Sequence, residues 1–369
     1  MEVRRYLQRF SFKKYFPVEI LRFLMYNHKK WEVLFMDKNT KKIIAISSVT
    51  AVAVTATLAA TYFTTKLLAS IALDREAPPV IKKAGNLISG SKNNDDISKL
   101  VADTGAALEE KVTETVSIIS SDGIRLTAHW YPCENAKRVV IAMHGWRSTW
   151  SGNFGVIADF WHDQGCSILF PDQRGQNLSG GDYMGFGLAE RFDCLDWVHW
   201  AEENTDPSLP IYLAGVSMGA TTVLMTAGLD LPARVHGIVA DCGFTSPSGI
   251  WKHVVNKNLH LPYGLRGSIA SAICKQKIHM DPGSYSTIDA MKVSKTPVLL
   301  IHGTDDRFVP ISMTYDNFKA CVSPKRLFVV PGAAHGMSYI VNKEGYERTV
   351  CDFFSDFDAP CQATAEEKQ

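Results

Sequence analysis

The sequence predicts an α/β protein: a mostly parallel sheet of eight strands with helices on both faces and a small helical lid, preceded by one transmembrane helix. Three observations lead to this prediction. Short β-rich apolar runs alternate with longer amphipathic runs over residues 113–358, as strands joined by helical crossovers do. An uncharged apolar segment precedes them. The composition, 46% hydrophobic and 21% charged over 369 residues, supports a large core and excludes collagenous and wholly disordered proteins.

The apolar segment is Ile43–Thr65, which holds no charged residue between Lys42 and Lys66. As a helix it would measure about 34 Å, enough for a hydrocarbon core of about 30 Å. A buried core helix usually has a polar side, and here the polar residues are only Ser and Thr. The apolar region of a signal peptide is normally about 7–15 residues long, although Ser70-Ile71-Ala72 resembles a cleavage site. We therefore expect an uncleaved anchor.

Charge is distributed unevenly along the chain. Residues 1–42 hold 11 Lys/Arg and 4 Asp/Glu, and residues 43–369 hold 28 and 34, so the first segment is +7 and the rest −6. The basic side of an anchor stays in the cytoplasm, which places the remainder on the extracytoplasmic side. An acidic body without a basic stripe argues against nucleic acid as a partner.

The segments outside the main domain are polar or basic. Residues 66–112 are expected to form a juxtamembrane linker with one short helix near Ile97–Lys111, and residues 359–369 a polar tail. Met36–Lys42 alone would make an ordinary short cationic segment before the anchor, so translation starting at Met36, with residues 1–35 untranslated, is one hypothesis. A basic, aromatic segment lying on the inner membrane face is the other.

Eight strands are expected in the domain at residues 113–358. Asp122-Gly123 between the first two indicates an antiparallel hairpin, and the helical stretches between the later strands indicate parallel pairing. Residues 243–296 form a short insert, the predicted lid. Ligands of such sheets bind at the carboxyl ends of the strands. The expected strands are Thr115–Ser120, Arg125–Tyr131, Arg138–His144, Ser167–Pro171, Ile211–Gly215, Val235–Asp241, Val298–His302 and Arg326–Val330.

One strand end carries a nucleophile signal. The fifth strand leads into Gly215-Val216-Ser217-Met218-Gly219, and a helix-forming run follows. A strained turn between a strand and a helix presents a serine hydroxyl, and small flanking residues are needed because bulky ones would block it. A helix-capping serine would give the same string by chance. Strand, turn and helix together favour Ser217 as a nucleophile.

Two later strand ends supply an acid and a base. The seventh strand leads into His302-Gly303-Thr304-Asp305-Asp306, and the eighth into Pro331-Gly332-Ala333-Ala334-His335. The order Ser, Asp, His is that of α/β-hydrolases. Residues 115–355 resemble a serine hydrolase of the α/β-hydrolase superfamily, similar to membrane-anchored bacterial carboxylesterases and prolyl-oligopeptidase-like members.

The resemblance implies roles for individual residues. His-Gly-x-x-Asp assigns the acid to Asp306, with Asp305 and Asp241 as alternatives, and His335 becomes the general base. His144 and His302 are expected to organise loops. The oxyanion hole is expected from the backbone N–H groups of Met218 and Trp146, although the loop His144-Gly145-Trp146-Arg147 departs from the His-Gly-Gly-Gly of many esterases.

Other side chains carry weaker expectations. Asp172 and Arg174, after the fourth strand, are expected to pair at the rim of the site. Trp146 and Trp150 either line an acyl pocket or cover the core. A set of lid residues either forms an apolar acyl site or packs the lid onto the body: Trp251, Leu259, Leu261, Tyr263 and Leu265.

The predicted function is hydrolysis of a small carboxylic ester through an acyl-enzyme, with a short to medium acyl chain because the lid is small. Peptide or amide hydrolysis, acyl transfer, and a catalytically silent interaction module are the alternatives. The eight cysteines show no ligand spacing and are expected to be buried thiols, and no metal or cofactor motif is present in the sequence. The sequence does not indicate an oligomeric state.

Overall fold

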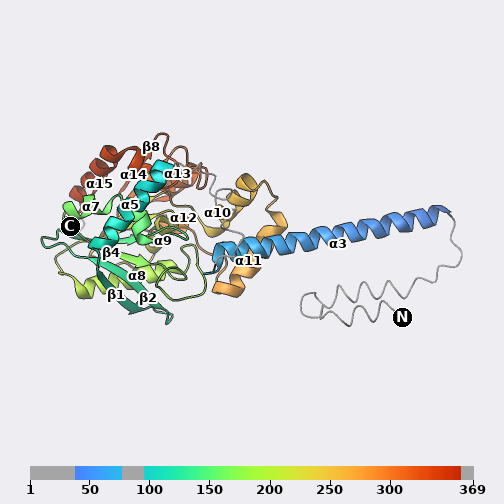
Figure 1. Cartoon of the computed structure of the whole chain (residues 1–369), viewed down its shortest axis with the longest axis horizontal. Coiled ribbons are helices and arrows are strands. Elements are labelled where there is room, and N and C mark those ends of the chain that lie inside the picture. Colours follow the sequence, from blue (N-terminus) through green and yellow to red (C-terminus); the bar gives the residue numbers. More distant parts are fainter. Residues whose placement is uncertain (1–37, 77–94, 359–369) are drawn as a thin grey trace, which may run out of the picture. The chain divides into compact units, whose positions relative to one another are not determined.

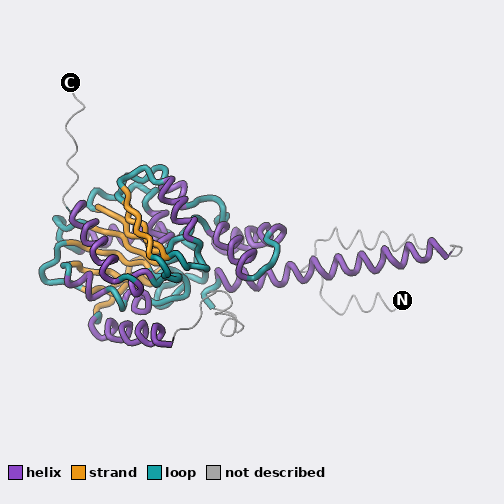
Figure 2. The backbone as a smooth tube through the Cα atoms, turned by 90° about the horizontal axis from the view of Figure 1, so that it is seen from above, coloured by secondary structure: helices purple, strands orange, loops and turns teal. Residues whose placement is uncertain are grey.

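A computed structural model describes residues 38–76 and 95–358. The expectations for residues 1–35 and 359–369 lie outside the described residues. The chain divides into two units, and the boundary between them in the sequence lies between Ala60 and Thr61, inside helix α3 (Lys38–Leu73). The second unit holds the end of α3 and the whole sheet (Figures 1 and 2).

Helix α3 continues past Thr65, where the uncharged segment ends, to Leu73. Within it, Thr50–Leu73 is long and apolar enough to cross a membrane, with a mean hydropathy of 1.3. Threonine hydroxyls of this stretch donate to carbonyls one turn back, as Thr55 does to Ala51 at 2.9 Å, and so need no water. The side chains of its last turns are buried in the second unit, at Thr65, Ala69, Ile71 and Leu73.

The sheet confirms the predicted architecture. Its order is β1-β2-β4-β3-β5-β6-β7-β8; β1 pairs with β2, and β2 with β4, antiparallel, and the other neighbours are parallel. In the first hairpin Gly123 has φ +87°, a backbone conformation that glycine adopts without strain. The strands are β1 (Glu114–Ile119), β2 (Arg125–Tyr131), β3 (Arg138–Met143), β4 (Cys166–Asp172), β5 (Ile211–Val216), β6 (Val235–Asp241), β7 (Val298–Gly303) and β8 (Lys325–Val330).

Helices cover both faces of the sheet because its central strands are apolar on both sides. In β3, Ile141 packs in one buried cluster and Val140 in the other. The first face is covered by α8 (Glu190–Asn204), α9 (Met218–Thr226), α12 (Thr287–Met291) and α13 (Ile311–Ala320). The second face is covered by α5 (Asp95–Lys111), α6 (Trp150–Phe154), α7 (Ala158–Asp163), α14 (Ser338–Val341) and α15 (Lys343–Phe357).

The lid consists of α10 (Pro247–His253), a π-helical turn (Val254–Asn258) and α11 (Gly264–Ile278). A third, smaller buried cluster joins it to the body, and Leu73 of α3 belongs to this cluster. Arg266 of α11 donates to the Thr64 hydroxyl at 2.7 Å, and α11 lies along the last turns of α3 in Figure 1. The lid and the end of α3 therefore form one packed layer over the carboxyl edge of the sheet.

Candidate active site

Ser217 occupies the turn between β5 and α9. Its φ of +56° lies in the left-handed region, which costs a residue with a Cβ on the order of 1–3 kcal/mol. Two glycines make the turn possible. A Cβ on Gly219 would lie 1.8 Å from the Met143 carbonyl oxygen, and one on Gly215 would lie 2.3 Å from the Gly219 carbonyl oxygen. The Gly-x-Ser-x-Gly spacing is therefore a steric requirement of this turn.

His335 and Asp306 reach Ser217 from the loops that follow β8 and β7. The His335 Nε2 atom lies 2.8 Å from the Ser217 hydroxyl oxygen, and its Nδ1 lies 2.6 Å from Asp306 Oδ2. The three side chains come from the loops after β5, β7 and β8. These strands are parallel, so the loops lie at the same edge of the sheet, with the end of β6 between those of β5 and β7. A hydroxyl, an imidazole and a carboxylate in this chain of hydrogen bonds can transfer the hydroxyl proton to the ring.

The surroundings of Asp306 stabilise its charge. Its Oδ1 accepts from the backbone N–H groups of Phe308 at 2.9 Å and Val309 at 2.8 Å, and its Oδ2 also lies 3.2 Å from His302 Nε2. Burial favours the neutral acid, but the His335 and His302 rings outweigh it and hold the pKa of Asp306 well below its ordinary value. An ionised Asp306 fixes the proton of His335 on Nδ1 and leaves Nε2 free to accept.

The two alternative acids lie elsewhere. Asp305 is exposed and accepts from its neighbour, the Thr304 hydroxyl, at 3.0 Å. Asp241 is buried and accepts from the Ser338 hydroxyl at 3.0 Å, and burial raises the pKa of Asp241 to about 6. Of the three aspartates, Asp306 is the one that hydrogen-bonds to His335.

The loop after β3 is held by side chains of two other segments. The Gly145 N–H donates to Asn153 at 2.6 Å, and the Arg147 N–H donates to Gln176 at 2.6 Å. Within the described chain, no acceptor pairs with the N–H of Trp146, which lies between them, or with the N–H of Met218. His144 accepts at Nε2 from the Gln173 N–H at 3.1 Å, so its Nδ1 donates to the Gly145 carbonyl.

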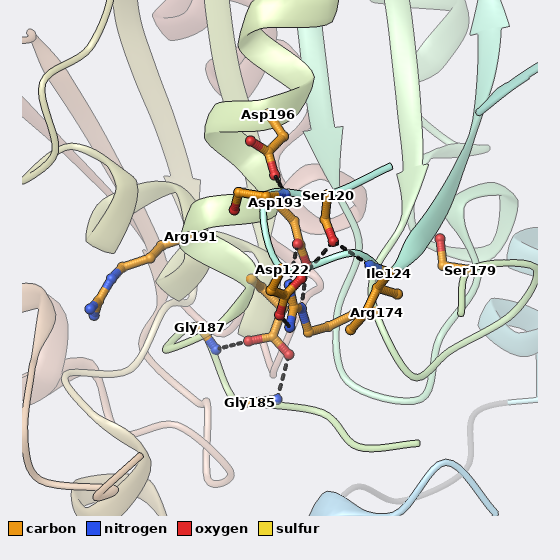
Figure 3. A network of polar contacts seen from close by, with 12 residues as sticks. Ser120, Asp122, Ile124, Arg174, Ser179, Gly185, Gly187, Arg191, Asp193 and Asp196 are labelled. Atoms are coloured by element: carbon orange, nitrogen blue, oxygen red, sulfur yellow. Dashed lines mark hydrogen bonds and ion pairs between the residues drawn. The ribbon is translucent and has the colours of Figure 1, made fainter. Parts of the chain in front are cut away.

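The loop after β4 differs from expectation, because Arg174 does not pair with Asp172. Arg174 is buried and bridges Asp122 and Asp193, as Figure 3 shows. Asp172 instead lies 3.2 Å from His129 Nε2 and accepts from the Leu178 N–H. The guanidinium pairs with two carboxylates at once, Asp122 of the β1–β2 hairpin and Asp193 of α8. Two partners compensate for its burial better than one could. The network fixes the loop that carries Gln173 and Gln176.

Two cavities meet at Ser217. One, of about 100 Å³, is almost wholly apolar; Trp146, Phe186 and Phe308 are among its lining residues. The other, of about 520 Å³, holds His335 in its wall together with polar groups of the loop after β3. Trp146, Phe308 and Ser217 line both. The serine thus faces a narrow apolar space on one side and a wider, more polar one on the other.

The expected lid residues divide between these environments. Trp251, Leu259 and Tyr263 line the apolar cavity, whereas Leu261 and Leu265 do not. Trp150 is buried in the cluster on the second face of the sheet and so covers the core.

Sequence reasoning missed five residues of α3 that line the apolar cavity: Thr65, Leu68, Ala69, Ile71 and Ala72. Four of them, Thr65, Leu68, Ala69 and Ala72, follow the spacing i, i+3, i+4 and i+7 of one helix face. The signal for it was the face of small and apolar residues that runs on from the end of the uncharged segment, although Lys66 interrupts the apolar run in the sequence. The treatment of residues 66–112 as a linker hid it.

The described thiols do not suggest a metal site. Cys242 offers its sulfur within 4.8 Å of donor atoms of Asp306 and His335. Burial raises the pKa of the Cys242 thiol well above its ordinary value, and both His335 nitrogens are hydrogen-bonded within the site. The seven described cysteines are free thiols; Cys361 lies outside the described residues.

The mostly parallel sheet, the strained serine turn after β5 and the loops after β7 and β8 that carry Asp306 and His335 are those of the α/β-hydrolase fold. Residues 153–357 match the prolyl oligopeptidase family, and this match covers more than half of the chain. The chain belongs to this family of α/β-fold serine hydrolases.

Two sequence relatives and one solved structure match most of the chain. Uncharacterized protein YqkD of Bacillus subtilis is 26% identical over 269 residues, which are 72% of this chain and 88% of YqkD. Uncharacterized protein YfhR of Escherichia coli K12 is 23% identical over 60% of this chain and 73% of its own. The Pyrococcus furiosus esterase Pf2001 superposes with a TM-score of 0.56 at 22% identity, over 67% of this chain and 91% of the esterase.

Proposed function

We propose that the protein hydrolyses carboxylic esters through an acyl-enzyme, with Ser217, His335 and Asp306 as its catalytic residues. The hydrogen-bonded chain from the Ser217 hydroxyl through His335 to Asp306, at 2.8 and 2.6 Å, carries the proposal. Ser217 attacks the carbonyl carbon and its proton passes to His335 Nε2. The same proton then goes to the departing alkoxide oxygen, which leaves as the alcohol.

Water completes the cycle in the reverse sense. His335 takes a proton from water, the hydroxide attacks the acyl carbon, and the acid departs as the Ser217 oxygen is reprotonated. In both steps the negative carbonyl oxygen is held by the N–H groups of Trp146 and Met218. Two observations support these donors. Met218 follows Ser217 directly and Trp146 lines both of its cavities, and neither N–H group has an acceptor within the described chain.

An acyl group suits the apolar cavity better than a peptide does. A peptide bound there would bury N–H and C=O groups without partners, at a cost of roughly 1–3 kcal/mol for each. The cavity next to Ser217 is almost wholly apolar. The family name nevertheless keeps peptide and amide hydrolysis as the second candidate, since the prolyl oligopeptidase match covers the acid and base loops.

The test is labelling of the full chain with a fluorophosphonate, followed by a panel of esters and aminoacyl amides. We expect labelling of wild-type protein, its loss in Ser217→Ala, and turnover of the esters. Turnover of amides alone would make the protein a peptidase or amidase. A folded sample that neither labels nor hydrolyses would show a silent hydrolase fold that serves as an interaction module.

We further infer that α3 anchors the protein in a membrane, with the N-terminus in the cytoplasm and the hydrolase unit outside. The length and composition of Thr50–Leu73 support the span, and the basic excess of residues 1–42 supports the orientation. Protease added to intact cells should digest the hydrolase unit. Full protection of the hydrolase unit, with digestion only after lysis, would indicate the opposite topology.

A further inference from the structure

The end of α3 forms one wall of the apolar cavity beside Ser217. Thr65, Leu68, Ala69 and Ala72 line the cavity from one face of the helix. From Thr65 to Ala72 the helix advances about 10 Å. The cavity thus follows two turns of α3 toward Ser217, and Ile250, Trp251 and Val254 of the lid also line it.

Side chains of the loop after β3 hold this end of the helix in place. The Trp146 indole donates to the Ala72 carbonyl at 3.0 Å, and the Arg147 guanidinium donates to the Ile71 carbonyl at 2.9 Å and to the Asp74 carbonyl. The Ile71 and Ala72 carbonyls belong to the last turn of α3, where no further helical N–H follows to bond them, and Asp74 comes directly after the helix. The loop that supplies the proposed oxyanion donor is therefore also the cap of α3, and the wall is a fixed part of the site.

Other apolar side chains near this end of α3 do not line the cavity and are exposed. Phe63 is 62% exposed, Tyr62 41% and Leu67 39%. All three belong to the candidate span Thr50–Leu73. One helix thus presents one apolar face to the reaction chamber and other apolar side chains to the surroundings. An aqueous surface gives such side chains no favourable contact, whereas lipid acyl chains do.

We propose that the substrate is an amphiphile resident in the membrane, and that its acyl chain lies against the Thr65–Ala72 face of α3 when Ser217 attacks. The proposal rests on the proposed ester hydrolysis. The leaving alcohol or headgroup occupies the wider cavity, which has polar groups in its wall and holds His335, the donor of the leaving-group proton. Ala69 and Leu68 are the residues of α3 that set the acyl length.

The first experiment compares full-length variants in detergent on p-nitrophenyl octanoate and p-nitrophenyl acetate. Ala69→Phe places a ring in the cavity, and Leu67→Phe, two residues earlier on the exposed face, is its matched control. We expect the octanoate-to-acetate ratio of kcat/KM to fall on the order of tenfold or more in Ala69→Phe, since a single methylene in an apolar pocket is worth roughly 10–200-fold. The ratio should not change in Leu67→Phe.

A second variant covers the case in which Ala69→Phe does not fold. Leu68→Ala enlarges the same cavity and should move the optimum of an acyl-length series to longer chains. An unchanged ratio in Ala69→Phe together with an unchanged optimum in Leu68→Ala would overturn the inference. Fluorophosphonate labelling of the wild type separates the two failures: labelling without these effects leaves the proposed hydrolase standing, and absence of labelling removes both.

The second experiment tests the source of the substrate. The full chain is reconstituted in phosphatidylcholine vesicles, and 4-methylumbelliferyl palmitate is placed either in the same vesicles or in separate ones. We expect faster hydrolysis when enzyme and ester share a vesicle, because the chain then reaches α3 without crossing water. Equal rates in both arrangements, or turnover of water-soluble esters only, would refute a membrane-resident substrate.

Discussion

Asp306→Asn tests the assignment of the acid through the geometry of its two oxygens. Oδ1 accepts two backbone N–H bonds, from Phe308 and Val309, and Oδ2 faces His335. In the asparagine variant the two N–H donors still need an acceptor, so the amide oxygen stays in the Oδ1 position. The NH₂ group then occupies the Oδ2 position and donates to His335 Nδ1.

This donation changes the state of the imidazole. His335 must then carry its proton on Nε2, the atom 2.8 Å from the Ser217 hydroxyl, and cannot accept the serine proton. Loss of the correct tautomer in a Ser-His-Asp site costs about 10⁴ in kcat, or about 5 kcal/mol of barrier. We expect a loss of this size in Asp306→Asn with little change in stability, because the fold keeps both backbone hydrogen bonds.

The assay is kcat for p-nitrophenyl acetate, with unfolding by urea as the measure of stability. Asp305→Asn is the matched control, since its carboxylate is exposed and bonds to Thr304; it should retain wild-type kcat. The reasoning fails if Asp306→Asn stays within tenfold of the wild type, or if Asp305→Asn falls as far.

Two further predictions concern stability. Asp241 has a pKa of about 6 in the folded protein, above its value near 3.9 in the unfolded chain. Between these two pH values the folded state binds a proton that the unfolded state does not. The free energy of unfolding therefore falls as pH rises through this window, by up to about 3 kcal/mol. Asp241→Asn, which keeps an acceptor for Ser338, should remove that decline in urea titrations at pH 4 and pH 7.5; parallel curves for both proteins would contradict it. Gly219→Ala forces a Cβ to within 1.8 Å of the Met143 carbonyl oxygen and should cost about 1–3 kcal/mol or more and abolish ester turnover. Gly264→Ala, whose added Cβ meets nothing within 4 Å, should instead gain about 0.4–1 kcal/mol, and equal effects of the two substitutions would argue against the steric account of the turn.

Much of the fold could be predicted because the strands are apolar runs with clear ends. The strand predicted over Val235–Asp241 has the same bounds in the structure, and Asp122-Gly123 correctly predicted the hairpin of β1 and β2. The partners of Arg174 could not be predicted from sequence proximity. Asp172 is near in the chain, but Asp122 and Asp193 are near in space because a hairpin and a helix pack on either side of the loop.

Local conformation and periodicity were enough to predict the order of strands and helices along the chain, the Gly-x-Ser-x-Gly turn and the residue types at three strand ends. Tertiary packing brings Asp306 rather than Asp305 to His335, since adjacent residues of a loop point in different directions. Tertiary packing also places the last turns of α3 in the lining of the cavity beside Ser217. The α3 residues of this lining and Ser217 are about 150 positions apart in the chain. No local pattern predicts their proximity, because it results from the packing of a helix face against the lid.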